Sequence, residues 1–184
     1  MKRPQRHLTI IMTVLLAMYL LLTRLPPAAA LALLGALVLY VLGTAVWGRD
    51  LLIARRHSKK KNYAQAVERY ERFEKKLISL GWPRVAFVLY PNIYSFDGIA
   101  VARNYIGQDL LKAKDLDRAV VWLRAALQHD PFYPVPYVSL AVIAATRGDA
   151  STAKREMTKA VQLGFDTTSA QRILQKALDE NEIE

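Results

Sequence analysis

The 184-residue chain contains no cysteine and only three histidines, His7, His57 and His129. Disulfide scaffolds, thiolate zinc sites and cysteine nucleophiles are therefore excluded. The histidines are far apart and form no metal-ligand spacing such as HxxxH. The sequence also lacks a phosphate-binding glycine loop, a GxSxG motif and paired catalytic carboxylates. We therefore predict no enzymatic activity, no metal site and no cofactor.

The chain has little charge imbalance outside two short stretches. Its formal net charge is +10, yet residues 62–184 carry 16 basic and 15 acidic side chains. The excess lies in residues 1–7 and 49–61, which flank the most apolar part of the sequence. A nucleic-acid-binding domain needs a basic face of its own. Nucleic acid is therefore not an expected partner.

Two apolar runs near the N-terminus lack charged residues, which predicts membrane spans over about 8–23 and 28–47. The second run is long enough for a hydrocarbon core of about 30 Å. The first is short, so it must recruit flanking residues or thin the bilayer locally. Pro26 and Pro27 lie between the runs and cannot continue a helix. These features predict a transmembrane hairpin over residues 1–54.

The distribution of lysine and arginine sets the expected orientation. Three lie before the first span, Arg24 alone lies between the spans, and six lie in residues 49–61. The positive-inside rule places both ends and the following domain in the cytoplasm of a plasma or inner membrane. The spans contain no ionisable residue, so we expect an anchor and no ion pathway. Two alternatives are a signal peptide cleaved near Ala28–Ala30 and a core helix of a soluble bundle.

A basic stretch follows the second span, over residues 55–61, and we interpret it as a juxtamembrane linker. Such clusters are attracted to anionic lipid headgroups. We predict headgroup contacts from Arg55, Arg56, Lys59, Lys60 and Lys61. An alternative is that these residues only set the membrane topology and have no further function.

From residue 62 the apolar spacing becomes helical, and a 34-residue repeat emerges. Small residues return at fixed positions: Ala119 matches Ala153 and Ala126 matches Ala160, while charged residues vary freely. Small residues are required where two helices approach closely. The pattern therefore predicts packed helix pairs.

This period and skeleton resemble the tetratricopeptide repeat family. The resemblance implies an all-α fold, with clear repeats at about 100–133 and 134–167 and a capping helix at 169–180, within a domain spanning 62–184. Residues 62–73 resemble the second helix of a degenerate earlier repeat, with Ala66 placed 53 residues before Ala119. At five positions the chain carries a residue other than the one that is usual in the family. These residues are Arg103, Leu110, Lys114, Ala144 and Phe165.

In this family the first helix of each repeat lines a concave surface that binds extended segments or helices. The resemblance implies a partner-binding face made of Val101, Asn104, Gln108, Leu111, Val135, Val138 and Val142. The valines favour an apolar peptide or protein partner. An alternative is that they are buried within the protein itself.

The segment Gly81–Phe96 contains two prolines and five aromatic residues and fits neither a repeat helix nor a polar loop. Three interpretations are open. It packs into the repeat core or groove, it lies at the headgroup region, or it forms an exposed partner site. We expect Trp82, Phe87, Tyr90 and Phe96 to complete the repeat core.

Together these features predict a membrane-anchored repeat scaffold that binds a protein partner at the cytoplasmic face. The alternative is a structural or assembly subunit of a membrane complex with contacts through its spans.

Overall fold

The computed structural model describes residues 12–13, 19, 26–79 and 94–182. All regular elements among them are helices, which confirms the predicted all-α class for this part of the chain. In chain order they are α2 (Pro27–Trp47), α3 (Arg49–Lys59), α4 (Tyr63–Ser79), α5 (Gly98–Lys112), α6 (Leu116–His129), α7 (Pro134–Thr146), α8 (Ala150–Gln162) and α9 (Thr167–Glu182).

One turn geometry joins the helices within each of three pairs, α3–α4, α5–α6 and α7–α8. The second residue after the first helix of each pair adopts a left-handed backbone conformation. These residues are Lys61 (φ 61°), Lys114 (φ 62°) and Gly148 (φ 77°). The next N–H then donates to a carbonyl five residues earlier, from Asn62 to His57, from Asp115 to Leu110 and from Asp149 to Ala144. This pattern is a Schellman motif, which ends a helix and reverses the chain.

The helix after each of the last two turns begins with a capping aspartate. Asp115 accepts a hydrogen bond from the backbone N–H of Arg118, and Asp149 accepts one from that of Thr152. These caps satisfy donors that the first helical turn leaves unpaired. The two turns lie 34 residues apart, so the sequence repeat is also a repeat of local backbone structure.

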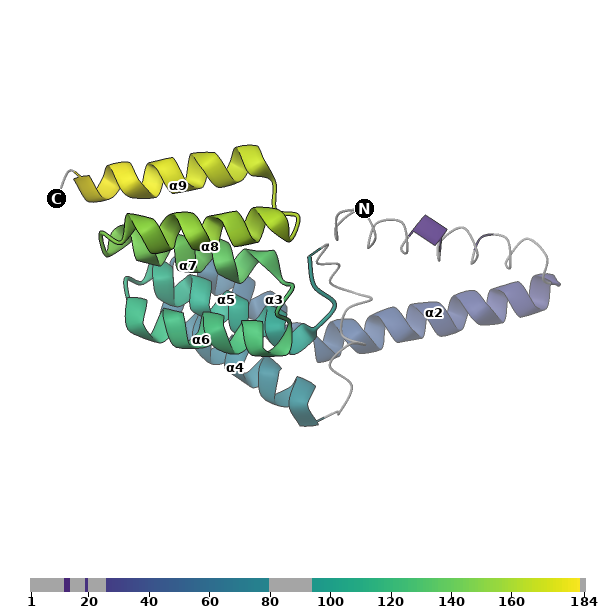
Figure 1. The fold of residues 1–184 in the computed structure, drawn as a ribbon. Coiled ribbons are helices and arrows are strands. Elements are labelled where there is room, and N and C mark those ends of the chain that lie inside the picture. The colour runs from purple at the N-terminus through teal and green to yellow at the C-terminus, as the bar shows by residue number, and fades with distance from the viewer. Residues whose placement is uncertain (1–11, 14–18, 20–25, 80–93, 183–184) are drawn as a thin grey trace.

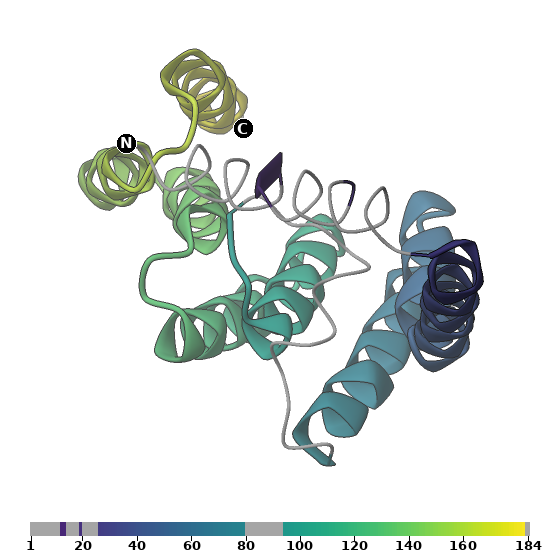
Figure 2. The ribbon, with the colours of Figure 1, turned by 90° about the vertical axis from the view of Figure 1, so that its right-hand side faces the viewer.

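The alanines that recur in the sequence are fully buried between helices. Ala66, Ala119, Ala126, Ala153 and Ala160 have no exposed surface. Their small side chains let neighbouring helices approach closely. Successive helices pack against one another in order from α3 to α9, as Figures 1 and 2 show.

Helix α3 belongs to this packed array. Leu51 is 2% exposed and Ala54 is 0% exposed, and both join the core formed by α4, α5 and α6. Residues 55–59, which we interpreted as linker, are therefore the last turns of a packed helix. Helix α3 pairs with α4 through the same turn as the two later pairs, whereas the predicted helical domain began only at residue 62.

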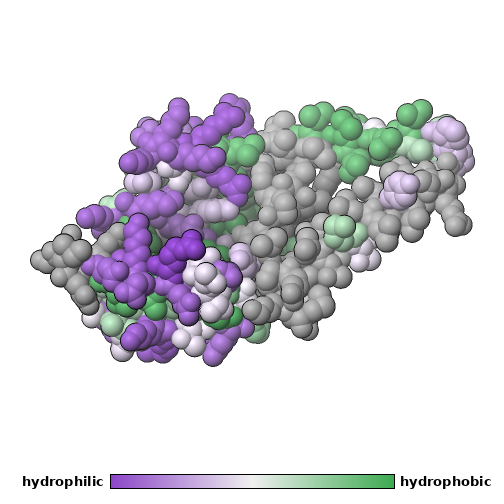
Figure 3. All heavy atoms as spheres, turned by 90° about the horizontal axis from the view of Figure 1, so that it is seen from above, coloured by the Kyte–Doolittle hydropathy of each residue, from purple (hydrophilic) through white to green (hydrophobic). Residues whose placement is uncertain are grey.

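Helix α2 extends away from the helical array (Figure 1). Its 21 residues carry no charged side chain, and leucines along its length are exposed, from Leu31 (69%) to Leu42 (56%). Figure 3 shows mostly apolar side chains along α2 and mostly hydrophilic side chains on the surface of the array. Among the described residues, no helix is both long and apolar enough to cross a membrane. Most of the predicted first span, and the side chains of residues 40, 41 and 44–47 in the second, lie outside that description.

Helix α9 contains the predicted capping segment 169–180. It packs mainly against α7, where Ala170 and Ala177 are buried in the two clusters at this end of the array. The array is therefore covered by α3 and α4 at one end and by α9 at the other.

Candidate functional site

The residues predicted to face a partner are divided between buried and half-buried positions. Val101, Asn104 and Val138 are 7%, 1% and 8% exposed. The other four, Gln108, Leu111, Val135 and Val142, are half-buried. Asn104 Nδ2 donates to Tyr133 Oη at 3.2 Å, so this amide group is engaged inside the protein. The half-buried residues are thus the accessible remainder of the predicted face.

The chain itself covers part of that face. Tyr94 and Phe96, at the end of the aromatic segment, pack against the buried cluster of Ala100, Val101 and Tyr133. The Tyr94 ring also lies 6.0 Å from the Phe165 ring, centroid to centroid. Residues 94–96 therefore pack against the helical array. Trp82, Phe87 and Tyr90, predicted to join them, lie outside the described residues.

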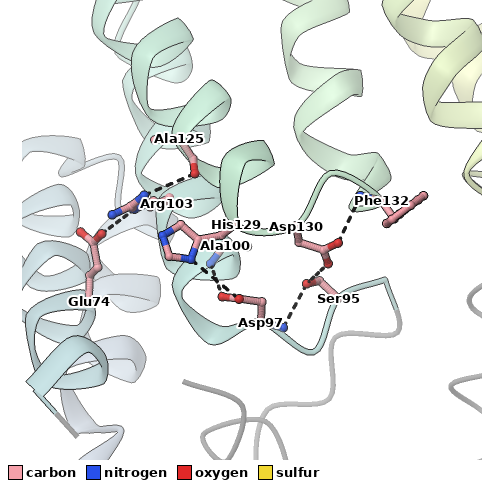
Figure 4. A network of polar contacts seen from close by, with 9 residues as sticks. All are labelled: Glu74, Ser95, Asp97, Ala100, Arg103, Ala125, His129, Asp130 and Phe132. Atoms are coloured by element: carbon pink, nitrogen blue, oxygen red, sulfur yellow. Dashed lines mark hydrogen bonds and ion pairs between the residues drawn. The ribbon is translucent and has the colours of Figure 1, made fainter. Parts of the chain in front are cut away.

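A polar network fastens this segment to the turn between α6 and α7 (Figure 4). Ser95 is fully buried, and its Oγ donates to Asp130 Oδ2 at 2.6 Å. Asp97 caps α5 by accepting from the Ala100 N–H at 2.9 Å. Asp97 Oδ2 also lies 3.8 Å from His129 Nδ1, an ion pair when the imidazole is protonated. These bonds fix where the segment meets the array.

Arg103 occupies a position where the repeat family usually has an aromatic residue. Its Nε donates to Glu74 Oε1 at 2.5 Å, and its Nη1 donates to the Ala125 carbonyl at 3.3 Å (Figure 4). The side chain therefore joins α4, α5 and α6. This departure from the family pattern has a structural explanation, because Glu74 and Arg103 satisfy each other in a largely buried setting.

An open groove of about 490 Å³ lies between α3 and α5. Basic and aromatic side chains dominate its lining, together with one carboxylate. The lining residues are Leu52, Arg55, Arg56, Ser58, Lys59, Tyr70, Tyr105, Gln108, Asp109 and Lys112. Four cations against one carboxylate leave this groove positively charged.

Side-chain hydrogen bonds between α3 and α5 hold the groove in shape. Arg55 Nη2 donates to Tyr105 Oη at 2.5 Å, and its guanidinium carbon lies 5.0 Å from the Tyr105 ring centroid. Tyr105 stacks on Tyr70, with centroids 5.4 Å apart. Burial is the main cause that raises the pKa of Tyr70 above its usual range, so this phenol stays protonated. The stacked pair therefore forms an uncharged aromatic wall of the groove.

Asp109 is the carboxylate of the groove, and it is 2% exposed. Its Oδ1 accepts from Ser58 Oγ at 2.7 Å and from Lys112 Nζ at 2.8 Å. Its Oδ2 is buried and has no hydrogen-bond partner within the described part of the chain. The Lys112 ammonium offsets the charge of Asp109 locally.

Arg56 and Lys59, in contrast, are exposed cations without an ion-pair partner among the described residues. The carboxylate elsewhere on α3, Asp50, is engaged by Arg69 and Lys76 from α4. Burial tends to raise the pKa of Asp50, but the hydrogen bonds and charges of Lys76 and Arg69 outweigh burial and lower it. Asp50 therefore stays ionised and does not neutralise the groove.

Three of the predicted headgroup contacts, Arg55, Arg56 and Lys59, line this groove, whereas Lys60 and Lys61 form the turn that follows. Sequence reasoning missed Ser58, Tyr105 and Lys112 as members of the site. A signal was present, because Arg55 precedes Gln108 by the same 53 residues that separate Ala66 from Ala119. Extending the repeat back by this distance would have placed α3 beside α5.

The chemical groups of the groove lining indicate which kind of ligand would fit it. The groove offers guanidinium, ammonium and hydroxyl groups, which are suited to oxyanions. Comparison with known proteins adds no family: no protein-family model matches the chain, and no curated protein matches it.

Proposed function

We propose that the protein is a membrane-anchored adaptor of the tetratricopeptide type, whose helical domain holds a protein partner at the cytoplasmic face. The observation that carries this proposal is the junction at Gly48. The uncharged helix α2, with its exposed leucines, is separated by this single residue from α3, which packs into the helical array. Anchor and binding domain would thus be joined without a flexible linker.

Two features support a tetratricopeptide type of scaffold. The turns at Lys114 and Gly148 have the same hydrogen bonds 34 residues apart, and the alanines at that spacing are fully buried. Arrays of this kind bind partners on the surface lined by the first helix of each pair. In this chain the accessible part of that surface contains Gln108, Leu111, Val135 and Val142.

The absence of cysteine makes the membrane topology directly testable. In the full chain, Arg24→Cys should react with a membrane-impermeant maleimide in intact cells. Lys154→Cys, on the exposed surface of α8, should react only after permeabilisation. Labelling of Lys154→Cys in intact cells would reject the proposed orientation.

Partner binding is tested by crosslinking in native membranes. A photoreactive amino acid at Gln108 or Val135 should capture a specific protein. The same group at the exposed Lys159 on α8 is the matched control. Identical crosslinks from all three positions would contradict a partner site on the proposed face.

A second candidate function is assembly of a membrane complex through the spans. It is favoured by Gly35 and Gly43 on α2, because no described atom lies within 4 Å of a β-carbon built at either glycine. This face of α2 is open to another helix. If it is the working surface, Gly35→Leu should disrupt a native complex while crosslinks from Gln108 persist.

A further inference from the structure

We infer that the groove between α3 and α5 binds the phosphate-bearing headgroup of an anionic phospholipid and so holds the helical domain against the membrane surface. This inference rests on the proposed membrane anchoring. It goes further by assigning a defined lipid site that includes residues of α5, in place of diffuse attraction to a basic segment.

Charge is the first observation. Arg55, Arg56 and Lys59 on α3 converge with Lys112 on α5 around one groove, and Asp109 is its only carboxylate among the described lining residues. Lys112 already lies 2.8 Å from Asp109. The exposed cations Arg56 and Lys59 therefore remain available for a phosphate, which accepts strong charge-assisted hydrogen bonds from such groups.

Position is the second observation. Arg55 lies eight residues beyond Trp47, the last residue of α2, or about 12 Å along a helix. The interfacial layer extends about 5–7 Å beyond the hydrocarbon core on each side. Side chains on a helix lean towards its N-terminus, and long basic side chains reach several ångströms further. The cations of α3 can therefore reach the headgroups of the membrane that holds α2.

The third observation concerns the shape and remaining polarity of the groove. Leu52, 41% exposed, lines it beside the basic residues and offers an apolar contact to the glycerol region of a lipid. The buried Asp109 Oδ2 has no hydrogen-bond partner within the described residues. A headgroup that carries a hydroxyl donor would satisfy this oxygen. Phosphatidylglycerol combines that hydroxyl with a phosphate, so we choose it as the probe.

The experiment measures phosphatidylglycerol binding to the full chain in a mild detergent by native mass spectrometry, with phosphatidylcholine as the reference lipid. Removing two basic groups near an anionic surface weakens attraction by about 1 kcal/mol each. The double variant Arg56→Gln/Lys59→Gln should therefore bind phosphatidylglycerol about 10- to 30-fold more weakly than the unmodified chain. Both residues are exposed, so the fold should persist. The single variant Lys59→Gln, with about a fivefold loss, provides a second test.

Two control variants remove the same charge. Lys60→Gln/Lys61→Gln changes the adjacent basic residues, which do not line the groove, and should weaken binding less than threefold. Lys154→Gln/Lys159→Gln changes exposed residues on α8 and should leave binding unchanged. Equal losses from the Arg56/Lys59 and Lys60/Lys61 pairs would overturn the inference in favour of diffuse attraction. Unchanged binding by the Arg56/Lys59 pair would also overturn it.

Inorganic phosphate distinguishes a lipid from a soluble ligand. At 10 mM it should displace little phosphatidylglycerol. Full displacement would instead assign the groove to free phosphate. If Arg56→Gln/Lys59→Gln loses the partner crosslink at Gln108 but still binds phosphatidylglycerol, the groove binds a protein segment instead of a lipid.

Carbonate extraction of membranes tests the anchoring separately. If carbonate extracts the unmodified chain, the proposed function fails. If the chain stays in the membrane but its lipid binding does not depend on the groove residues, only the inference about the groove fails.

Discussion

Gly107 on α5 lies so close to Leu123 on α6 that a β-carbon built on the glycine would stand 2.6 Å from Leu123 Cγ. The same β-carbon would lie 3.3 Å from the Ala119 carbonyl oxygen. Leu123 is fully buried, so it cannot turn outward without losing its core contacts. The close approach of α5 and α6 at this point therefore depends on the absence of a side chain at residue 107.

Gly107→Ala should consequently destabilise the protein. Overpacking a filled core costs about 1–3 kcal/mol, which exceeds the gain of about 1 kcal/mol from replacing glycine by alanine in a helix. Chemical denaturation of the full chain in detergent measures the difference. Gly35→Ala is the matched control, because nothing lies within 4 Å of its β-carbon position. Equal stability of the two variants would contradict the close contact.

The repeated alanines give a second prediction. Ala119→Leu and Ala153→Leu each insert three carbon atoms at a site with no exposed surface. Each should lower the free energy of unfolding by about 1–3 kcal/mol. The exposed Lys159→Ala should stay within about 0.5 kcal/mol of the unmodified chain. Indistinguishable melting temperatures for the three would mean that these helices do not meet at the alanines.

These alanines show what sequence alone could supply. Their 34-residue spacing predicts both contact positions, because close helix packing tolerates only small side chains. The sequence pattern did not predict that helix α3 packs in the same array. Its basic residues suit a membrane linker as well as an exposed helix face, and only Leu51 and Ala54 mark its buried side. Patterning cannot separate those alternatives when so few apolar residues carry the signal.

The position of the proposed partner-binding face was also only partly predictable. The family pattern places Val101 and Val138 on the concave surface, but both are buried. Tyr94 and Phe96 pack against the cluster that contains Val101, and they belong to a segment that the repeat pattern does not include. A repeat rule describes contacts between repeats and contains no information about an inserted segment. The cation-lined groove depends likewise on a contact between α3 and α5 that spans about 50 residues.

A third prediction concerns the turn residues Lys114 and Gly148. Both have left-handed backbone conformations, with φ of 62° and 77°. A non-glycine residue there costs roughly 1 kcal/mol. Lys114→Gly should therefore stabilise the protein by up to about 1 kcal/mol, while Gly148→Ala should destabilise it by a similar amount. Lys154→Gly, within helix α8, should be destabilising and shows that glycine is not stabilising in general. A loss of stability in Lys114→Gly, or unchanged stability in Gly148→Ala, would contradict the turn geometry.

A fourth prediction concerns acid stability. Hydrogen bonds from the Thr152 side chain and backbone N–H, and then from Ser151, lower the pKa of Asp149 to about 2. Because this pKa is depressed below the ordinary aspartate value of 3.8, the ionised cap stabilises the fold above about pH 4, and that contribution disappears as the pH falls towards 2. Asp149→Asn keeps a capping oxygen but cannot titrate. Its melting temperature should fall less steeply than that of the unmodified chain between pH 4 and 2. Parallel pH profiles would show that Asp149 does not contribute in this way.

The last prediction tests whether α3 is part of the folded domain. Leu51 and Leu52 are adjacent and chemically identical, but Leu51 is 2% exposed and packs in the core, whereas Leu52 is 41% exposed. Removing a buried leucine side chain costs about 2–5 kcal/mol because transfer free energy is lost and a cavity remains. Leu51→Ala should therefore lower the free energy of unfolding by that amount in the full chain. Leu52→Ala, where most of the change is at the surface, should cost well under half as much. If α3 were a loosely attached linker, both variants would unfold at the same denaturant concentration as the unmodified chain. A large effect at residue 51 alone would instead require the array to begin at α3, directly after the apolar helix, and would place the groove between α3 and α5 within the stable fold.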